Sequence, residues 1–221
     1  MPQMSDWLAW QVVDSAFPVG VFAHSWGLEA AWQAGYVDND ATLQQFLVES
    51  IQQTGWSALP LLNSAYQQPT RLRELDELAH AFLTNSVVSR ASRVQGRTLV
   101  ATASKVWPSR AMTELEIQVP DGWAHVAPLS GVVFRIIDLA HNTAQKAMLF
   151  GTARGILSAA VRLGIVGSYR AQRMQHDAGR WLDVTLERCG ELGAEDVVQT
   201  APVLDLLQGM HDRLYSRLFQ S

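Results

Sequence analysis

Apolar residues recur at steps of three and four along most of the chain, the spacing that lines one side of an α-helix. The clearest stripes are Leu43, Phe46, Leu47 and Ile51; Leu72, Leu75, Ala79 and Phe82; and Val203, Leu207, Met210, Leu214 and Leu218. Each stripe predicts one amphipathic helix, and the third stripe predicts a helix that continues to Leu218.

Helix-start signals accompany all three stripes. Asp40 is the expected N-cap of the first helix, because a short carboxylate side chain can accept a free backbone N–H there. Pro69 and Thr70 precede the second stripe, and Pro202 suits the first turn of the third helix. These signals place the helix beginnings close to residues 40, 70 and 202.

Strand signals are sparse. The run from Leu115 to Val119 alternates, but it is short and ends at the turn sequence Pro120-Asp-Gly122, so we expect a helix end or an extended loop. The proline-rich stretch 107–128 is the expected break between an N-terminal half of about 1–107 and a C-terminal half of about 125–221. We predict an all-α fold, a single-domain helical bundle of eight to ten helices that forms one unit over residues 1–221.

Composition excludes several classes of protein. With 48% hydrophobic and 17% charged residues in 221, disorder is not expected. A net charge of −4 argues against a nucleic-acid partner or an anionic membrane surface. The longest apolar stretch, 147–167, is interrupted by Arg154 and Arg162, which argues against a membrane span. A lone cysteine, Cys189, and the lack of a secretory signal favour a cytoplasmic protein.

Nucleotide and metal chemistry have no motif in this chain. The lysines, Lys105 and Lys146, do not follow a glycine-rich loop, so hydrolysis of ATP or GTP is not expected. The six histidines lack metal-ligand spacing, so we expect no first-shell metal site within one chain. His125 and His176 are interpreted as ordinary hydrogen-bonded histidines, with a place along a metal path as the alternative.

A serine nucleophile deserves one test. The run AHSWG around Ser25 is similar to the turn that carries the nucleophile of α/β-hydrolases. That turn needs a preceding strand, and Pro18 and Gly20 interrupt the approach. We therefore expect no catalytic residue, and we keep a serine hydrolase that uses Ser25 as the weaker alternative.

The chain has an interface composition. Of its 17 basic residues only two are lysines, which leaves 15 arginines, and eight residues are tryptophan. Trp26 and Trp32 are either interface anchors or core residues. The small residues Gly151, Gly155 and Ala159 recur every four positions, which predicts a groove where a second helix packs closely.

Three segments together resemble the UreF family of urease accessory proteins. Residues 17–29 read FPVGVFAHSWGLE, followed by AGYV at 34–37, which is similar to the family's N-terminal signature in its plant-type form with His24. The C-terminus reads APVLD at 201–205 and HDRLYSRLFQS at 211–221, and SAAVRL at 158–163 resembles a family helix. The sequence after residue 163 differs from the family's usual turn, and Gln220 stands where the family often has arginine.

The resemblance implies an all-α homodimer without a catalytic centre. It implies binding to the accessory protein UreD, also called UreH, and recruitment of the GTPase UreG. The assembly would deliver nickel to apo-urease, with GTP hydrolysis by UreG coupled to nickel transfer. No resident cofactor is implied, because nickel would pass only transiently. A helical interaction module for another metalloenzyme remains the main alternative.

The N-terminal signature assigns roles to individual residues. Pro18 and Gly20 are expected to form a structural turn. His24, Ser25 and Glu29, with Tyr36 further on, are expected to contact UreD or UreG from one face. The alternative is that His24 and Ser25 only cap and brace the helix that follows.

The C-terminal tail is expected to dock in a partner groove. Its side chains combine aromatic, cationic and apolar groups, and they are Tyr215, Ser216, Arg217, Leu218 and Phe219. A free tail of this kind would fray and become ordered on binding. The alternative is that Leu218 and Phe219 fold back on the core of their own chain.

Overall fold

The computed structural model describes residues 5–19 and 24–220. Over these ranges the regular secondary structure is helical, and no β-strand is present. The ten helices are α1 (Ser5–Val13), α2 (Leu28–Gln33), α3 (Asp40–Gln67), α4 (Leu72–Phe82), α5 (Ser86–Val106), α6 (Arg110–Gln118), α7 (Val126–Ile136), α8 (His141–Arg162), α9 (Ser168–Cys189) and α10 (Pro202–Met210). The predicted all-α class and the predicted number of helices are confirmed.

The helix starts follow the sequence signals to within two residues, since α3, α4 and α10 begin at Asp40, Leu72 and Pro202. The cap of α3 is Asn39 rather than Asp40, because the Asn39 side chain accepts the N–H groups of Ala41 and Thr42 at 2.8 and 3.1 Å. Thr42 completes a capping box by accepting the N–H of Asn39 at 3.1 Å. Asp40 lies instead in the first turn, where its charge complements the helix dipole.

The structure tests two predictions about local structure, the length of the third helix and the form of the run at 115–119. The third stripe does not form one helix, because α10 ends at Met210 and Leu214 and Leu218 lie beyond it. The alternating run at 115–119 is the end of a helix, as one of the two expected forms. The proline-rich break therefore contains α6 rather than only loop.

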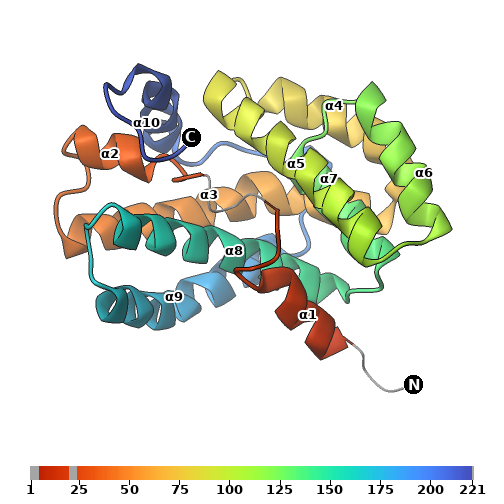
Figure 1. Ribbon diagram of the computed structural model, residues 1–221, viewed down its shortest axis with the longest axis horizontal. Coiled ribbons are helices and arrows are strands. Elements are labelled where there is room, and N and C mark those ends of the chain that lie inside the picture. Colours follow the sequence, from red (N-terminus) through yellow and green to blue (C-terminus); the bar gives the residue numbers. More distant parts are fainter. Residues whose placement is uncertain (1–4, 20–23, 221) are drawn as a thin grey trace.

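Helix α3 runs through the middle of the molecule and connects the two halves (Figure 1). It packs against α7, α8 and α9, all of which come from the second half. Two glycines permit this: a side chain at Gly55 would meet Thr185 of α9 at 2.2 Å, and one at Gly131 of α7 would meet the Leu62 carbonyl at 2.4 Å. Burial of α3 by both halves provides the main hydrophobic stabilisation of the fold.

The apolar core lies in two main clusters at the two ends of α3. One cluster gathers side chains of α3, α4, α5 and α7, and includes Leu62, Leu75, Leu99, Leu129 and Val133. The other gathers α2, α3, α8 and α10, and includes Leu28, Phe46, Ile156, Leu204 and Phe219. The second cluster brings the N-terminal signature and the C-terminal tail into the same core.

The small-residue groove of α8 holds an indole ring rather than another helix. A side chain at Gly155 would lie 2.4 Å from Nε1 of Trp26, whereas one at Gly151 would meet nothing within 4 Å. The expectation of a close second helix is therefore wrong at Gly155. Trp32 is 42% exposed, so the two tryptophans have different environments.

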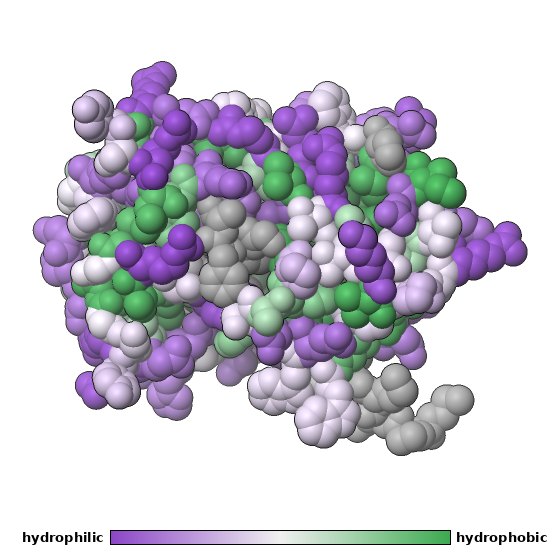
Figure 2. All heavy atoms as spheres, viewed as in Figure 1, coloured by the Kyte–Doolittle hydropathy of each residue, from purple (hydrophilic) through white to green (hydrophobic). Residues whose placement is uncertain are grey.

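Polar and apolar residues are unevenly distributed over the surface of the molecule. Figure 2 shows a face on which hydrophilic residues dominate and hydrophobic residues gather in separate patches. Among the described residues, no helix is long and apolar enough to cross a bilayer.

Candidate functional site

The N-terminal signature reaches α2 through a tight turn packed against α10. Trp26 and Gly27 both adopt left-handed backbone, with φ of 59° and 82°. A side chain at Gly27 would lie 2.4 Å from Cγ of Gln208, and Gln208 donates its amide to the Trp26 carbonyl at 3.1 Å. Glycine is required at position 27 both for its φ and for this close approach.

Glu29 is the centre of the contact between the signature and the tail. Its side chain is almost fully buried, and its Oε1 accepts the N–H of Leu218 at 2.6 Å. Its Oε2 accepts the N–H of Phe219 at 3.1 Å and lies 3.3 Å from Nε2 of His211. Hydrogen bonds to an ionised carboxylate are among the strong ones, so this arrangement fixes the tail backbone on α2. We call it the Glu29 clamp.

The tail side chains divide into buried and exposed groups. Phe219 is 5% exposed, and the Arg162 guanidinium lies 4.2 Å from its ring centroid. Tyr215 is fully exposed and Leu218 is 54% exposed. The structure thus folds Phe219 back on the core, as the alternative reading of the tail expected, and leaves Tyr215 and Leu218 at the surface.

The polar tail residues are also engaged. The Ser216 carbonyl accepts the Gln33 amide of α2 at 3.1 Å. Arg217 lies 3.6 Å from the carboxylate of Asp212, which also accepts a 2.7 Å hydrogen bond from Arg90 of α5. The backbone at Ser216 is therefore tied to α2, and the Arg217 side chain shares the Asp212 carboxylate with Arg90 of α5.

His24 and Ser25 lie inside the molecule, where they do not form an outer face of α2. Ser25 has no exposed surface and His24 has 5%. Burial lowers the pKa of His24, and the neighbouring His211 lowers it further. Within the described ranges no strand precedes Ser25, so the strand–turn–helix setting of a hydrolase nucleophile is missing there.

Two other predicted site residues lie away from the clamp contacts. Tyr36 donates its hydroxyl to Glu49 of α3 at 3.4 Å, and its pKa is raised by burial and then by the negative charge and hydrogen bond of Glu49. The Pro18 carbonyl accepts the Thr102 hydroxyl of α5 at 2.9 Å. Gly20 lies outside the described residues.

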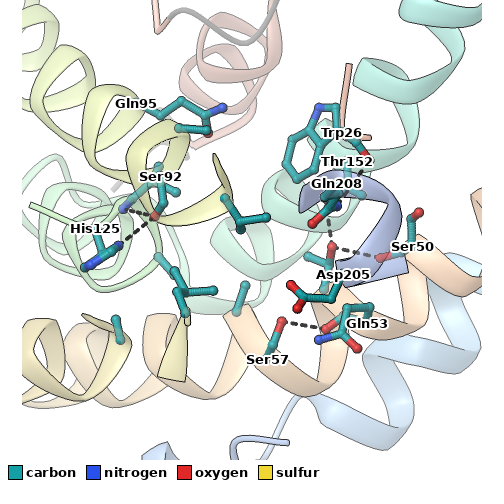
Figure 3. A pocket seen from close by; sticks show the side chains of 18 of the residues that line it. Trp26, Ser50, Gln53, Ser57, Ser92, Gln95, His125, Thr152, Asp205 and Gln208 are labelled. Carbon is teal, nitrogen blue, oxygen red and sulfur yellow. Dashed lines mark hydrogen bonds between the residues drawn. The ribbon is translucent and has the colours of Figure 1, made fainter. Parts of the chain in front are cut away.

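A cavity of about 190 Å³ lies between α3, α4, α5 and α10. Figure 3 shows its labelled polar side chains in two groups, with Ser92 and His125 at one end and Thr152, Asp205 and Gln208 at the other. Most of the remaining lining is apolar and includes Leu61, Ala79, Phe82, Val87, Val88 and Ala91. The lining offers neutral hydrogen-bonding groups more than charge.

His125 is an ordinary hydrogen-bonded histidine at the end of this cavity. Its Nδ1 lies 3.1 Å from the Ser92 hydroxyl and its Nε2 lies 3.4 Å from Nδ1 of His80. Its pKa is lowered to about 4, chiefly by burial, so the ring is neutral at physiological pH. His176 is exposed. In the described part of the chain, no three His, Cys, Asp or Glu side chains gather as a metal site would require.

Comparisons with known proteins show which family the chain belongs to. The model of the family described as UreF matches residues 37–179, more than half of the chain. The chain belongs to the UreF family. Urease accessory protein F of rice (Oryza sativa subsp. indica) is 36% identical over 225 residues, covering 99% of this chain and 86% of its own length.

Two further relatives support the membership. Urease accessory protein F of Arabidopsis thaliana is 37% identical over 221 residues, covering 97% of this chain and 92% of its own length. Urease accessory protein UreF of Arthrobacter sp. (strain FB24) is 30% identical over 214 residues, covering 96% and 95%. The family's name describes an accessory protein of urease.

Sequence reasoning missed several residues that hold the C-terminal tail in place. His211, Asp212 and Arg162 lie within the motifs that carry the family resemblance, yet no role was expected for them. Their position within those motifs was the one feature of the sequence that could have indicated a role for them. Contacts between α2 and residues 180 or more positions away leave no local pattern that would reveal a partner.

Proposed function

We propose that this UreF-family chain is a non-catalytic scaffold in cytoplasmic urease maturation. It binds UreD (UreH) and recruits the GTPase UreG, and the assembly delivers nickel to apo-urease. GTP hydrolysis takes place in UreG and is coupled through the scaffold to nickel transfer. Nickel is cargo in this proposal and needs no resident site in the chain.

The observation that carries the proposal is an apolar surface beside the Glu29 clamp. Val203, Leu206 and Met210 of α10 are 48%, 70% and 43% exposed, and their spacing places them on one side of the helix. Tyr215 and Leu218, close in sequence to the C-terminus, are also exposed. The C-terminus lies beside α10 and α2 (Figure 1). We call these exposed residues the α10 surface.

The α10 surface has the properties of a protein interface. Large contiguous patches of exposed apolar side chains are a recognised mark of protein–protein interaction sites. The Glu29 clamp holds the tail backbone in place, so Tyr215 and Leu218 are presented without a large loss of conformational entropy on binding. This supports the tail and α10 as the region that contacts UreD.

A pull-down with UreD and UreG, followed by urease activation with and without the chain, tests the proposal. We expect Leu206→Glu/Met210→Glu to lose co-purification with UreD and to lose urease activation, with an unchanged melting temperature. Ile117→Glu on α6 is the control, since Ile117 is also 70% exposed. Light scattering measures whether the chain alone is a dimer.

Two results would count against the scaffold role. Full urease activation in the absence of the chain would remove the function itself. Retained UreD binding by the α10 double variant would move the interface away from the α10 surface.

A further inference from the structure

The turn between α6 and α7 is pressed against α5 and held in one conformation. A side chain at Gly96 of α5 would lie 2.0 Å from the carbonyl oxygen of Ala124, so glycine admits the turn. Ala124 has left-handed backbone with φ of 68°. The buried carboxylate of Asp76 in α4 accepts the N–H groups of Ala124 and His125 at 2.8 and 2.7 Å. These bonds stabilise an otherwise strained turn.

The turn presents Trp123 between two basic side chains. Its indole ring, 40% exposed, stacks on the His80 imidazole with centroids 3.4 Å apart and planes 6° apart. The Arg93 guanidinium lies 5.8 Å from the ring centroid. Arg97 follows one turn later on α5 and is exposed. We call His80, Arg93, Arg97 and Trp123 the Trp123 patch.

The arginines of the patch have no acidic partner among the described residues. Arg90, the preceding arginine of α5, pairs with Asp212 at 2.7 Å. Within the described ranges, neither Arg93 nor Arg97 forms an ion pair, and Nε of Arg93 is buried with no hydrogen-bond partner. The nearby carboxylate, Asp76, already uses both oxygens on backbone N–H groups. The patch therefore carries positive charge that the chain does not neutralise.

Charge also distinguishes the possible ligands. Burial is the main cause of the low pKa of His125; Asp76 raises this pKa, and the neighbouring His80, Arg93 and Arg97 lower it. Within the described residues, no third His, Cys, Asp or Glu joins the His80–His125 pair in the way a metal site would require. A long polyanion such as nucleic acid is disfavoured by the net charge of −4.

We propose that the Trp123 patch is a docking site for an acidic segment of a partner protein, which rests on the scaffold role proposed above. Arg93 and Arg97 hold a carboxylate of the segment, because the guanidinium group binds a carboxylate through two parallel hydrogen bonds. The carbon atoms of the segment lie on the exposed part of the Trp123 ring. Tryptophan and arginine side by side are the composition that dominates binding energy at protein interfaces.

Nuclear magnetic resonance of the full-length chain tests the site directly. The indole N–H signal of Trp123, assigned with Trp123→Phe, is followed while acetylated tetraglutamate amide is added. We expect a saturable shift with tetraglutamate and none with tetralysine. In Arg93→Glu/Arg97→Glu we expect tetraglutamate binding at least ten-fold weaker, and Arg97→Glu alone, at an exposed position, weaker by several-fold.

The matched control is Arg173→Glu/Arg188→Glu. Both arginines are exposed on α9, which lies on the opposite side of the molecule from α5 (Figure 1). The two double variants have the same net charge, so a difference between them reports the patch and not the overall charge. Melting temperatures show that each variant is folded.

Three outcomes would overturn the proposal. They are no shift of the Trp123 signal, equal weakening in both double variants, and tighter binding of inorganic phosphate than of tetraglutamate, which would indicate a phosphate site. Urease activation is measured separately. If the chain bound tetraglutamate but urease were fully activated without the chain, the scaffold function would be refuted and the acidic-peptide site would stand.

Discussion

The carboxylate of Glu29 accepts the backbone N–H of Leu218 at 2.6 Å, across 189 positions of the sequence. The same side chain accepts the N–H of Phe219 and contacts His211, so three tail groups converge on one buried acid. Because Glu29 satisfies the backbone donors of Leu218 and Phe219, these residues need no helical partners. After α10 the chain makes one 3-10 turn, His211–Arg213, and residues 214–220 do not continue as helix.

Replacement of Glu29 by glutamine should weaken the clamp. The amide carries no charge and has one acceptor oxygen, so at least one tail N–H loses its bond and the others lose charge assistance. We expect Glu29→Gln to lower the free energy of unfolding by about 2 kcal/mol, measured by urea denaturation. Glu116→Gln on the exposed side of α6 is the control and should change stability by less than about 0.5 kcal/mol. Equal stabilities of the two variants would mean that the clamp adds nothing.

Two positions of the tail should separate stability from binding. Phe219→Ala empties a buried site and removes the contact with Arg162, so we expect a loss of about 3 kcal/mol in the free energy of unfolding. Tyr215→Ala removes a fully exposed ring and should leave stability unchanged while weakening co-purification with UreD. Thermal unfolding and pull-down measure the two effects. An unstable Tyr215→Ala would contradict the division.

Two glycines of α8 provide an internal comparison. In Gly155→Ala the new methyl group would lie 2.4 Å from Nε1 of Trp26, so the indole must move, and we expect a loss of about 1 to 3 kcal/mol. Gly151→Ala meets nothing within 4 Å and should stabilise the chain by up to about 1 kcal/mol, since alanine favours helix. Chemical denaturation of both variants checks the sign of each change. A stabilising Gly155→Ala would show that Trp26 does not occupy the groove.

The free energy of unfolding should fall as the pH is lowered from 6.5 toward 4, because His125 is protonated more readily in the unfolded chain than in the folded chain. Its pKa in the folded chain is about 4, against an ordinary value of 6.5, so between these values the unfolded chain binds the proton and the folded chain does not. The stability is fully present above pH 6.5 and is lost toward pH 4, with a total effect of about 3 kcal/mol. Burial also lowers the pKa of His24 and His141, so these two histidines add to the loss of stability at low pH.

The His125 contribution is isolated by comparing variants at several pH values. Urea denaturation between pH 5 and 7.5 should give a smaller slope of stability against pH for His125→Gln than for the unsubstituted chain. His176→Gln, at an exposed position, should retain the original slope. Identical slopes for all three proteins would exclude His125 as a source of the pH dependence.

Much of the fold could be predicted because its signals are local. A helix stripe needs only residues three and four positions apart, and α3, α4 and the start of α10 follow their stripes. The cap at Asn39 differed from the predicted Asp40 by one residue, because both side chains can cap and only the backbone geometry selects between them. The family could also be recognised, since its motifs are short and lie near the two ends of the chain.

The sequence by itself determined the helical class, the family and the chemistry that is available at each position. Tertiary structure alone decided that α10 stops at Met210, that Glu29 lies inside, and that Gly155 receives Trp26. A carboxylate on a helix normally favours solvent, and its burial depends on donors that arrive from the opposite end of the chain. The desolvation cost and the distant hydrogen bonds that offset it leave no repeating pattern in the sequence, unlike a helix stripe. The burial of Glu29 is therefore decided only when the chain has folded.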